Sequence, residues 1–284
     1  MSAPRYAELR ARLRSSRVVL VMTAALVVIA LFALAGPLIS PHSYQTTALD
    51  TKLAAPSLSD ARWFGTDELG RDLFVRSMLG VRVSLLVAVI ASLVSLVIGV
   101  LYGAVAGYVG GRLDAAMMRI VDTLYALPFV FFVILLTVYF DRNFFLIFVA
   151  IGAINWLDMA RIVRGQTISL KEREFVQAAR LSGVSSRGII ARHIAPNVAG
   201  VVIVYLTLTV PQALLFESFL SFLGLGVQEP QASLGALVND GVRQMEQAPW
   251  VLLIPGTLLA VILLCFNFLG DGLRDAFDTR ETPR

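Results

Sequence analysis

Charged residues are scarce in this chain of 284 residues, where Asp, Glu, Lys and Arg together make up only 15%. Soluble domains carry about 25% of such residues. Apolar residues reach 57%, and the mean hydropathy is +0.76. A soluble core cannot bury this much apolar surface, so the composition predicts an integral membrane protein.

Lysine, histidine and cysteine are also rare, and each shortage excludes a kind of site. A phosphate-binding loop needs Gly-Lys-Ser/Thr, but neither Lys52 nor Lys171 follows a glycine, so we do not expect this chain to hydrolyse ATP. His42 and His193 have no partner at metal-ligand spacing, which argues against a metal site and against histidine-based catalysis. Cys265 is the single cysteine and cannot form an intrachain disulfide. We therefore expect no catalytic residues and no cofactor bound by this chain.

Long apolar runs dominate what is present, and six of them predict membrane-spanning helices. A spanning helix needs about 20 apolar residues, and one central charge costs about 3 kcal/mol. The predicted spans are Val18 to Ala35, a part of Val83 to Gly111, Thr123 to Phe140, Phe144 to Leu157, Val198 to Leu223, and Trp250 to Leu269. The expected fold class is an all-α integral membrane protein with six transmembrane helices.

The first apolar run has two interpretations, because basic residues before an apolar stretch are also typical of a signal peptide. This run is longer than the usual signal core of about 7 to 15 residues. The pair Gly36-Pro37 predicts the start of a loop rather than a small-residue cleavage site. We therefore expect a first transmembrane helix within residues 18–39.

The distribution of Lys and Arg predicts the orientation. With a cytoplasmic N-terminal segment (1–17), the inside segments contain most of the 24 Lys and Arg residues. The outside segments hold only seven of them, although the external loop over residues 40–82 is the longest connection. The positive-inside rule then places both termini in the cytoplasm, with a core over 83–270 and a tail over 271–284. The basic residues do not gather on one soluble face, so nucleic acid is not an expected partner.

Glycines in the second span predict a packing surface. Gly99, Gly103 and Gly107 are four residues apart and lie on one face of a helix, which lets another backbone approach closely. Glycine is also simply common in membrane helices, which is the alternative explanation.

Five residues are candidates for a translocation path. Pro128 and Pro211 fall inside predicted spans, where a proline removes a backbone hydrogen bond and either splays helices around a path or only shapes them. Glu217 lies late in the fifth span with Ser218 and Ser221 close by. An ionisable residue at membrane depth is a functional candidate, and Glu217 either faces the path or bonds a neighbouring helix.

The most distinctive segment is a charged stretch from Glu174 to Asn197 between two apolar runs. Strong helix formers lead up to Gly183, which stands where a glycine ends a helix. Ser185 or Ser186 then caps a second short helix, which Pro196 stops before the fifth span. Two short helices that meet at Gly183 would form an angled knob.

Small, apolar and charged side chains on this knob suit a groove on a partner protein. The small residues are Ala178 and Ala179, and the apolar anchors are Phe175, Ile189 and Ile190. The charged rim consists of Glu174, Arg180, Arg187 and Arg192. An ordinary amphipathic connector is the alternative reading of the same pattern.

The segment resembles the EAA loop of binding-protein-dependent ABC importers, through which membrane subunits engage their ATPases. That pattern is Glu-Ala-Ala, three residues, Gly, nine residues, and Ile-x-Leu-Pro. The residues in register are Gln177, Ala178, Ala179, Gly183, His193 and Pro196, within a predicted docking loop over 168–197. Gln177 replaces the glutamate of the pattern and Ala195 its leucine, and Glu174, one helical turn earlier, is a candidate to supply the missing charge.

Further motifs resemble the C-type permease subunits of oligopeptide, dipeptide and nickel importers, and most closely those of the oligopeptide class. They are Gly65 to Asp72, Met118 to Asp122, Glu217 to Gly226, and Gly270 to Asp275. By the residues alone, Thr66 with Asp67 and Glu68 predicts a helix start, and Leu73 to Leu79 an amphipathic turn at the outer surface.

The resemblance implies a type I ABC importer permease in the bacterial cytoplasmic (inner) membrane, where lipid surrounds it. Its implied partners are a homologous second permease, two ATPases that use ATP and Mg²⁺, an external solute-binding protein and a peptide substrate. Dipeptides, nickel chelates, glutathione and antimicrobial peptides are alternative cargoes. An ion-coupled secondary carrier is a distant alternative. Such a carrier would need internal repeats and midplane ionisable residues, and we find neither in the sequence.

Overall fold

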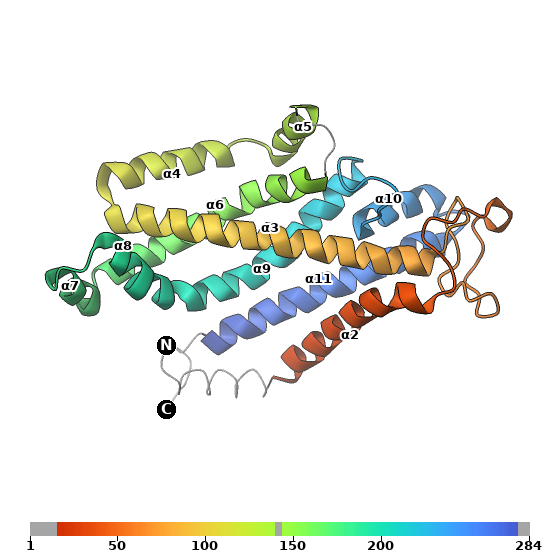
Figure 1. Ribbon diagram of the computed structural model, residues 1–284, viewed down its shortest axis with the longest axis horizontal. Coiled ribbons are helices and arrows are strands. Elements are labelled where there is room, and N and C mark those ends of the chain that lie inside the picture. Colours follow the sequence, from red (N-terminus) through yellow and green to blue (C-terminus); the bar gives the residue numbers. More distant parts are fainter. Residues whose placement is uncertain (1–15, 140–143, 278–284) are drawn as a thin grey trace.

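The computed structural model describes residues 16–139 and 144–277. Long helices run lengthwise through the molecule (Figure 1). The short helices α7 (Glu174–Leu181) and α8 (Ser186–Ile189) lie at one end, called the docking end below. Residues 40–72 lie at the opposite end, called the loop end, and α10 (Leu234–Gln244) packs toward it. The all-α class predicted from the sequence is confirmed.

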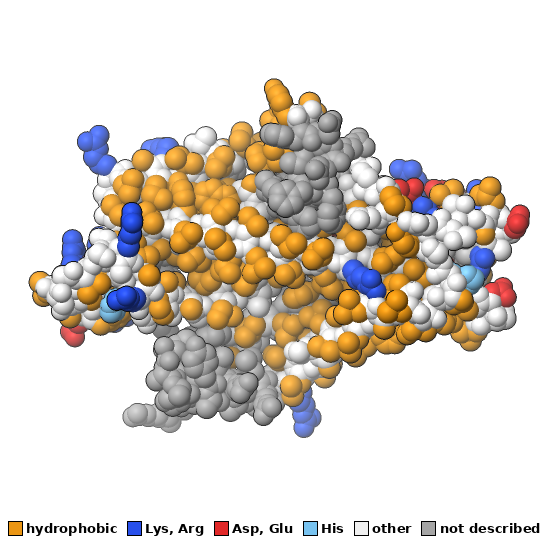
Figure 2. Space-filling model, in the orientation of Figure 1, with side chains coloured by type: hydrophobic (Ala, Val, Ile, Leu, Met, Phe, Trp, Pro, Cys, Tyr) orange, Lys and Arg blue, Asp and Glu red, His pale blue; other side chains and the backbone are white. Residues whose placement is uncertain are grey.

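Apolar side chains cover the outside of the bundle. In the described part of the chain, four helices are long and apolar enough to cross a membrane, or five if one bent pair counts as a single span. The four are α2 (Arg17–Ile39), α3 (Leu73–Val109), α9 (Ala195–Phe222) with the turns before it, and α11 (Pro249–Phe277). Figure 2 shows hydrophobic side chains over the middle of one face, with most charged side chains toward its two ends. This distribution fits a membrane protein, while the six-span count and the orientation of the termini remain predictions.

Helix α2 does not stop at Gly36-Pro37, where the sequence predicted the start of a loop. The helix continues to Ile39, and the Ser40 N–H donates to the Gly36 carbonyl at 3.1 Å. Pro37 has no N–H to offer the Ala33 carbonyl four residues earlier. The guanidinium of Arg82 on α3 donates to that carbonyl and also to the Leu34 carbonyl. An arginine from another helix therefore supplies the donor that the proline removes.

Helix α3 begins at Leu73, so the predicted helix start at Thr66 to Glu68 is wrong. Asp72 is the N-cap, and its Oδ1 accepts from the Val75 N–H at 2.8 Å. Leu73 to Leu79 was predicted to form a separate amphipathic turn at the surface, but these residues are the first turns of α3 and most of them are buried. They are buried because residues 40–72 fold over them and Trp63 packs edge-on against Phe74.

The predicted third span, Thr123 to Phe140, is broken. Helix α4 (Gly111–Tyr125) ends before Pro128, and α5 (Phe129–Tyr139) follows at an angle of 88°. Pro128 therefore lies in the break and not inside a helix, because the residue before a proline disfavours helical backbone. Phe140 lies outside the described residues.

The remaining long helices overrun their predicted ends. Helix α6 (Phe144–Lys171) contains the predicted fourth span and continues through its charged second half. Helix α11 reaches Phe277, so residues 271–277 of the predicted tail are helical. Both extensions run through glycines, Gly165 in α6 and Gly270 and Gly272 in α11. Hydropathy therefore marks the membrane part of a helix and not its end.

The two largest of the five buried clusters in the described residues hold most of the bundle together. The larger cluster joins α3, α9, α10 and α11, with Val87, Leu214, Leu234 and Ile262 almost fully buried. The smaller cluster lies under the docking end, around Met159. Helix α3 makes its most extensive contact with α6.

Candidate docking surface and polar clusters

Helix α7 ends at a glycine, as the sequence predicted. Gly183 has φ +78°, a left-handed conformation that favours glycine. The Gly183 N–H donates to the Arg180 carbonyl and the Val184 N–H to the Ala179 carbonyl, both at 3.1 Å. These bonds satisfy carbonyls at the end of α7 and turn the chain sharply.

The second short helix continues into the fifth span, which the sequence did not predict. Ser185 is its N-cap and accepts from the Gly188 N–H at 3.3 Å. A π-helical turn, Ile190–Ile194, then joins α8 to α9, and the Ala195 N–H bonds the Ile190 carbonyl five residues back. Pro196 was predicted to stop a helix, but it lies in the first turn of α9, where a missing N–H is tolerated. The docking end and α9 are therefore one continuous helical path.

One face of the knob anchors it to the bundle. Val176, Ile189 and Ile194 are almost fully buried and pack with residues of α3, α6 and α9. The prediction that Ile189 contacts a partner protein is therefore wrong, since only 1% of it is exposed. Ile189 is buried because it lies on the side of α8 that faces the bundle, and no local sequence pattern identifies that side.

The opposite face is open. Glu174, Phe175, Gln177, Ala178, Gly183, Arg187 and Pro196 are exposed, and Ala179, Ile190 and His193 are partly exposed. The rings of Phe175 and His193 lie 6.5 Å apart between centroids. The other residues predicted for docking are thus exposed or partly exposed at this end of the molecule, and their role in docking stays a prediction.

Leu181 is the exposed residue that sequence reasoning missed. It is 90% exposed at the end of α7, beside the turn at Gly183. Val176 marks the buried face of α7, and a residue five positions later lies well off that face. This offset is the signal that could have identified Leu181 as an apolar contact residue.

A polar hollow of about 100 Å³ lies between one side of α7 and the adjoining ends of α3 and α6. Its lining contains Lys171, Glu172, Gln177 and Arg180 together with Tyr108 and Val176. The Lys171 ammonium lies 5.9 Å from the centre of the Tyr108 ring. Gln177, which stands where the EAA pattern has glutamate, therefore lies near two cationic side chains.

The three glycines of α3 lie against α6. A Cβ atom on Gly103 would come within 2.3 Å of the Ala160 carbonyl oxygen. On Gly99 it would lie 2.5 Å from the Met159 Cβ, and on Gly107 2.7 Å from the Arg164 carbonyl oxygen. Only glycine permits this approach, so the face is a helix-packing surface.

Glu217 bonds a neighbouring helix, which is one of the two alternatives that the sequence left open. Its side chain is fully buried, and its carboxylate accepts from Ser84 Oγ of α3 at 2.8 Å and from Ser221 Oγ at 2.7 Å. Ser84 Oγ also accepts from the Leu234 N–H at the start of α10, at 3.1 Å. The carboxylate therefore joins α3, α9 and α10.

The other path candidates are distributed differently. Pro211 and Ser218 are buried in α9, whereas Pro128 is exposed in the break after α4. Ser218 lies under α10, since a Cβ on Gly235 would approach the Ser218 Cα to 2.4 Å. The structure does not bring Pro128 together with Glu217, so the five candidates do not form one cluster.

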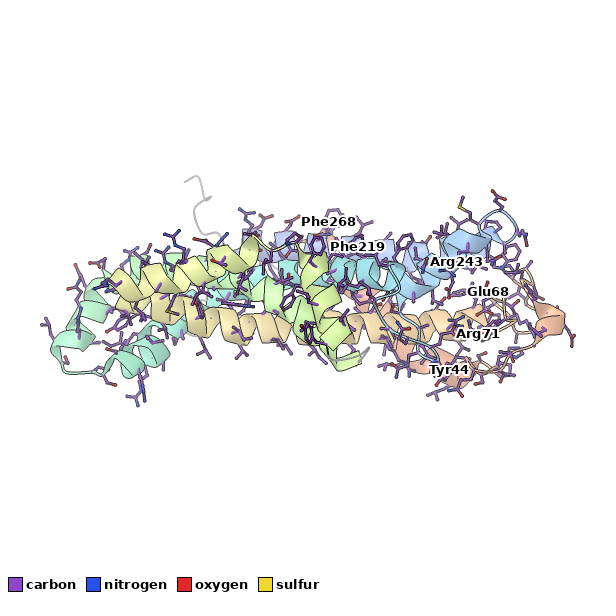
Figure 3. The ribbon with its side chains drawn as sticks, turned by 90° about the horizontal axis from the view of Figure 1, so that it is seen from above. Tyr44, Glu68, Arg71, Phe219, Arg243 and Phe268 are labelled. Carbon is purple, nitrogen blue, oxygen red and sulfur yellow. The ribbon has the colours of Figure 1, made fainter. Side chains whose placement is uncertain are left out.

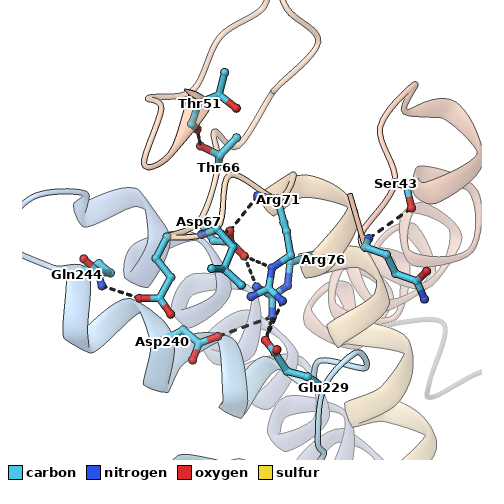
Figure 4. A network of polar contacts seen from close by, with 12 residues as sticks. Ser43, Thr51, Thr66, Asp67, Arg71, Arg76, Glu229, Asp240 and Gln244 are labelled. Carbon is cyan, nitrogen blue, oxygen red and sulfur yellow. Dashed lines mark hydrogen bonds and ion pairs between the residues drawn. The ribbon is translucent and has the colours of Figure 1, made fainter. Parts of the chain in front are cut away.

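A second polar cluster occupies the loop end. Figure 3 shows Arg71 and Glu68 at this end, together with Arg243 and Tyr44. Figure 4 shows the Asp67 carboxylate between the guanidinium groups of Arg71 and Arg76. Gln244 of α10 donates to Glu68 at 2.9 Å. The motif from Gly65 to Asp72 therefore forms a tertiary contact.

Charge and burial oppose each other at Asp67. Burial raises the pKa of this carboxyl, but the guanidinium of Arg76 and the hydrogen bonds from Arg71 outweigh burial and hold the pKa below its ordinary value. Burial also raises the pKa of Asp240 on α10, partly offset by Arg76. Asp67 is therefore the firmly ionised member of the cluster.

Comparisons with known proteins agree with these features. Residues 99–282 match the family described as "Binding-protein-dependent transport system inner membrane component". Residues 6–56 match the "N-terminal TM domain of oligopeptide transport permease C". The two matched regions include α2, the docking end and α9 to α11.

Curated relatives cover nearly the whole chain. The oligopeptide transport system permease protein OppC of Escherichia coli (strain K12) is 55% identical over 272 residues, which is 96% of this chain and 90% of the relative. OppC of Bacillus subtilis (strain 168) is 43% identical over 269 residues, covering 95% and 88%. The dipeptide transport system permease protein DppC of Bacillus subtilis (strain 168) is 44% identical over 270 residues, covering 95% and 84%. With its apolar helices, its exposed knob and these matches, the chain belongs to the family of inner membrane components of binding-protein-dependent transport systems.

Proposed function

We propose that this chain forms one half of a translocation pathway for oligopeptides and carries ATPase motion into the membrane. The proposal rests chiefly on the 55% identity to an oligopeptide permease over 96% of the chain. The pathway's other half is a homologous second permease, and an external solute-binding protein delivers the peptide. Two separate ATPases bind ATP and Mg²⁺, since no lysine of this chain stands in a phosphate-binding motif.

The exposed face of α7 and α8 is the proposed ATPase contact. Phe175 and Leu181 are large apolar side chains, 42% and 90% exposed, that suit a pocket on the partner. Ala178 permits close approach between them, and Glu174 and Arg187 form a charged rim. The two apolar side chains are exposed in the isolated chain and would be buried in the contact with the ATPase, which explains their presence on the knob.

The continuous path from α8 to α9 is the proposed route for motion. Val176 and Ile189 fix the knob to the bundle, so a push on the knob moves the adjoining ends of α3, α6 and α9 together. Helix α9 spans about 42 Å at 1.5 Å per residue and brings Glu217 near its far end. Closure of the ATPases would thus rock α9 and the α10 segment bonded to it between two states.

Replacing Leu181 with aspartate tests the docking surface. The Leu181→Asp chain should fold normally but lose most of the ATPase that co-purifies with it, since the charge would have to be buried in the contact. Leu58→Asp is the matched control, because Leu58 is 87% exposed at the loop end. Equal ATPase recovery from both variants would contradict docking through this face.

The cargo has a second candidate, because one relative at 44% identity is named a dipeptide permease. Mass spectrometry of the ligand carried by a co-purified binding protein distinguishes the two. Peptides longer than two residues support the oligopeptide assignment. A ligand set made only of dipeptides would replace it.

A further inference from the structure

Three carboxylates surround two guanidinium groups at the loop end, so one carboxylate is in excess. Arg71 and Arg76 are the cations, and Asp67, Glu229 and Asp240 are the acids (Figure 4). An excess partner permits more than one pairing within the same cluster. The carboxylates differ in burial, and this difference separates the one that stays paired from the one that can leave the cluster.

Asp67 is the fixed part. Its side chain is 2% exposed, and Oδ1 accepts from the backbone N–H groups of Leu69 and Arg71, both at 2.9 Å. Oδ2 accepts from Arg71 Nε at 2.7 Å and from Arg76 Nη1. Removing Asp67 would leave two buried cations without this partner, so it is a structural group.

Glu229 is the exchangeable part. It lies in the loop between α9 and α10, and its side chain is 63% exposed. Its Oε1 accepts from Arg71 Nη1 at 2.7 Å and lies 3.7 Å from Arg76 Nη2. If Glu229 leaves, Arg71 keeps Asp67 and Glu229 enters water, so neither group is left buried and unpaired.

Asp240 can replace Glu229 as the neighbour of Arg76. Its Oδ2 lies 3.7 Å from Arg76 Nη2, beyond hydrogen-bonding distance, and its side chain is 31% exposed. Asp240 belongs to α10, whereas Arg76 belongs to α3. A small approach of α10 would bring the pair into hydrogen-bond contact.

We propose that Glu229 is a releasable latch that holds the loop between α9 and α10 against the first turns of α3 in one state of the transport cycle. In the other state Glu229 leaves the guanidinium pair, and Asp240 closes on Arg76. The inference rests on the proposed transport function, because the cycle supplies the two states. It assigns Glu229 a positioning role that is separate from ATPase docking, since the two sites lie at opposite ends of the molecule (Figure 1).

A distance measurement between spin labels tests the latch in the complete complex with both permeases, the ATPases and the binding protein. The labels replace Leu58 and Gln231, which are both exposed, in a chain whose buried Cys265 is changed to alanine. Without nucleotide we expect one short distance. With the complex trapped by ATP and vanadate we expect a second, longer distance.

Glu229→Gln should raise the longer-distance fraction severalfold without nucleotide, and ATP hydrolysis without binding protein should rise with it. Glu246→Gln is the matched control, an exposed carboxylate on the same side of the molecule that lies outside the cluster. An unchanged distance in Glu229→Gln, or an equal change in the control, would overturn the proposal. Peptide uptake by the unaltered complex tests the transport function independently, so uptake with a distance that never changes would refute the latch alone.

Discussion

Single residues decide how closely the helices approach one another. Gly103 lets the backbones of α3 and α6 meet, and Arg82 supplies the donor that Pro37 removes from α2. Glu217 and Ser84 join helices far apart in sequence through a hydrogen bond inside the bundle. Arg82, Glu217 and Ser84 thus supply hydrogen bonds inside the bundle that water would supply in a soluble protein.

Gly103→Ala should destabilise the chain by about 1–3 kcal/mol, because the added methyl group overlaps the backbone of α6 and forces the helices apart. Thermal unfolding of the purified protein in nanodiscs measures the loss. Gly256→Ala is the control, since a Cβ there meets no atom within 4 Å. The packing argument fails if the two variants unfold alike.

Ser84→Ala should cost about 1–3 kcal/mol, because it removes a donor to Glu217 and an acceptor for the Leu234 N–H. Denaturant-induced unfolding in the same lipid environment reports the difference. Ser92→Ala is the matched control on α3, since the buried Ser92 hydroxyl has no hydrogen-bond partner within the described chain. A loss of equal size in both variants would contradict a role for the Glu217 cluster.

At the scale of elements, the docking end combines a rigid inner face with an open outer face. The turn at Gly183 sets the angle between α7 and α8, and the π-helical turn carries the chain from α8 into α9 without a loop. This arrangement suits an element that moves as a unit with α9. Its shape therefore depends on the backbone of one glycine.

Gly183→Val should weaken recovery of the ATPase on co-purification, because a side chain at φ +78° strains the turn by about 1–2 kcal/mol. Gly183→Asn should be milder, since asparagine tolerates this conformation better. Gly165→Ala on α6 is the control, with nothing within 4 Å of the added Cβ. Equal recovery from Gly183→Val and Gly183→Asn would argue against a conformational role for Gly183.

For the whole molecule, the separation of its two ends is the main feature. The docking end and the loop end lie at opposite extremes of the apolar bundle (Figures 1 and 2). A protein with this distribution presents one end to each side of the membrane. The proposed pathway, the docking surface and the latch depend on that orientation.

Thiol labelling tests the orientation. In a chain with Cys265 changed to alanine, an impermeant reagent should label Leu58→Cys in spheroplasts, where the outer face of the inner membrane is accessible. Ser186→Cys should be labelled only after the membrane is opened. Labelling of Ser186→Cys in sealed spheroplasts would place the docking end outside and exclude contact with cytoplasmic ATPases.

The sequence by itself determined the features that depend on neighbouring residues. Scarce charge and long apolar runs predicted the membrane class, Gly183 predicted the end of α7, and the glycine spacing around Gly103 predicted a packing face. These patterns work because hydropathy, helical periodicity and backbone conformation are local properties. They could not locate a helix end such as Lys171, which lies well beyond Leu157, where hydropathy placed the end of the fourth span.

Only the tertiary structure decided which side chains meet. Arg82 bonds α2, Ser84 bonds Glu217 across 133 positions, and Arg71 bonds Glu229 across 158. It also buried Ile189 and exposed Leu181. The physical reason is that burial and pairing depend on which surfaces pack together in space, and residues this far apart in the chain become neighbours only when the bundle is complete.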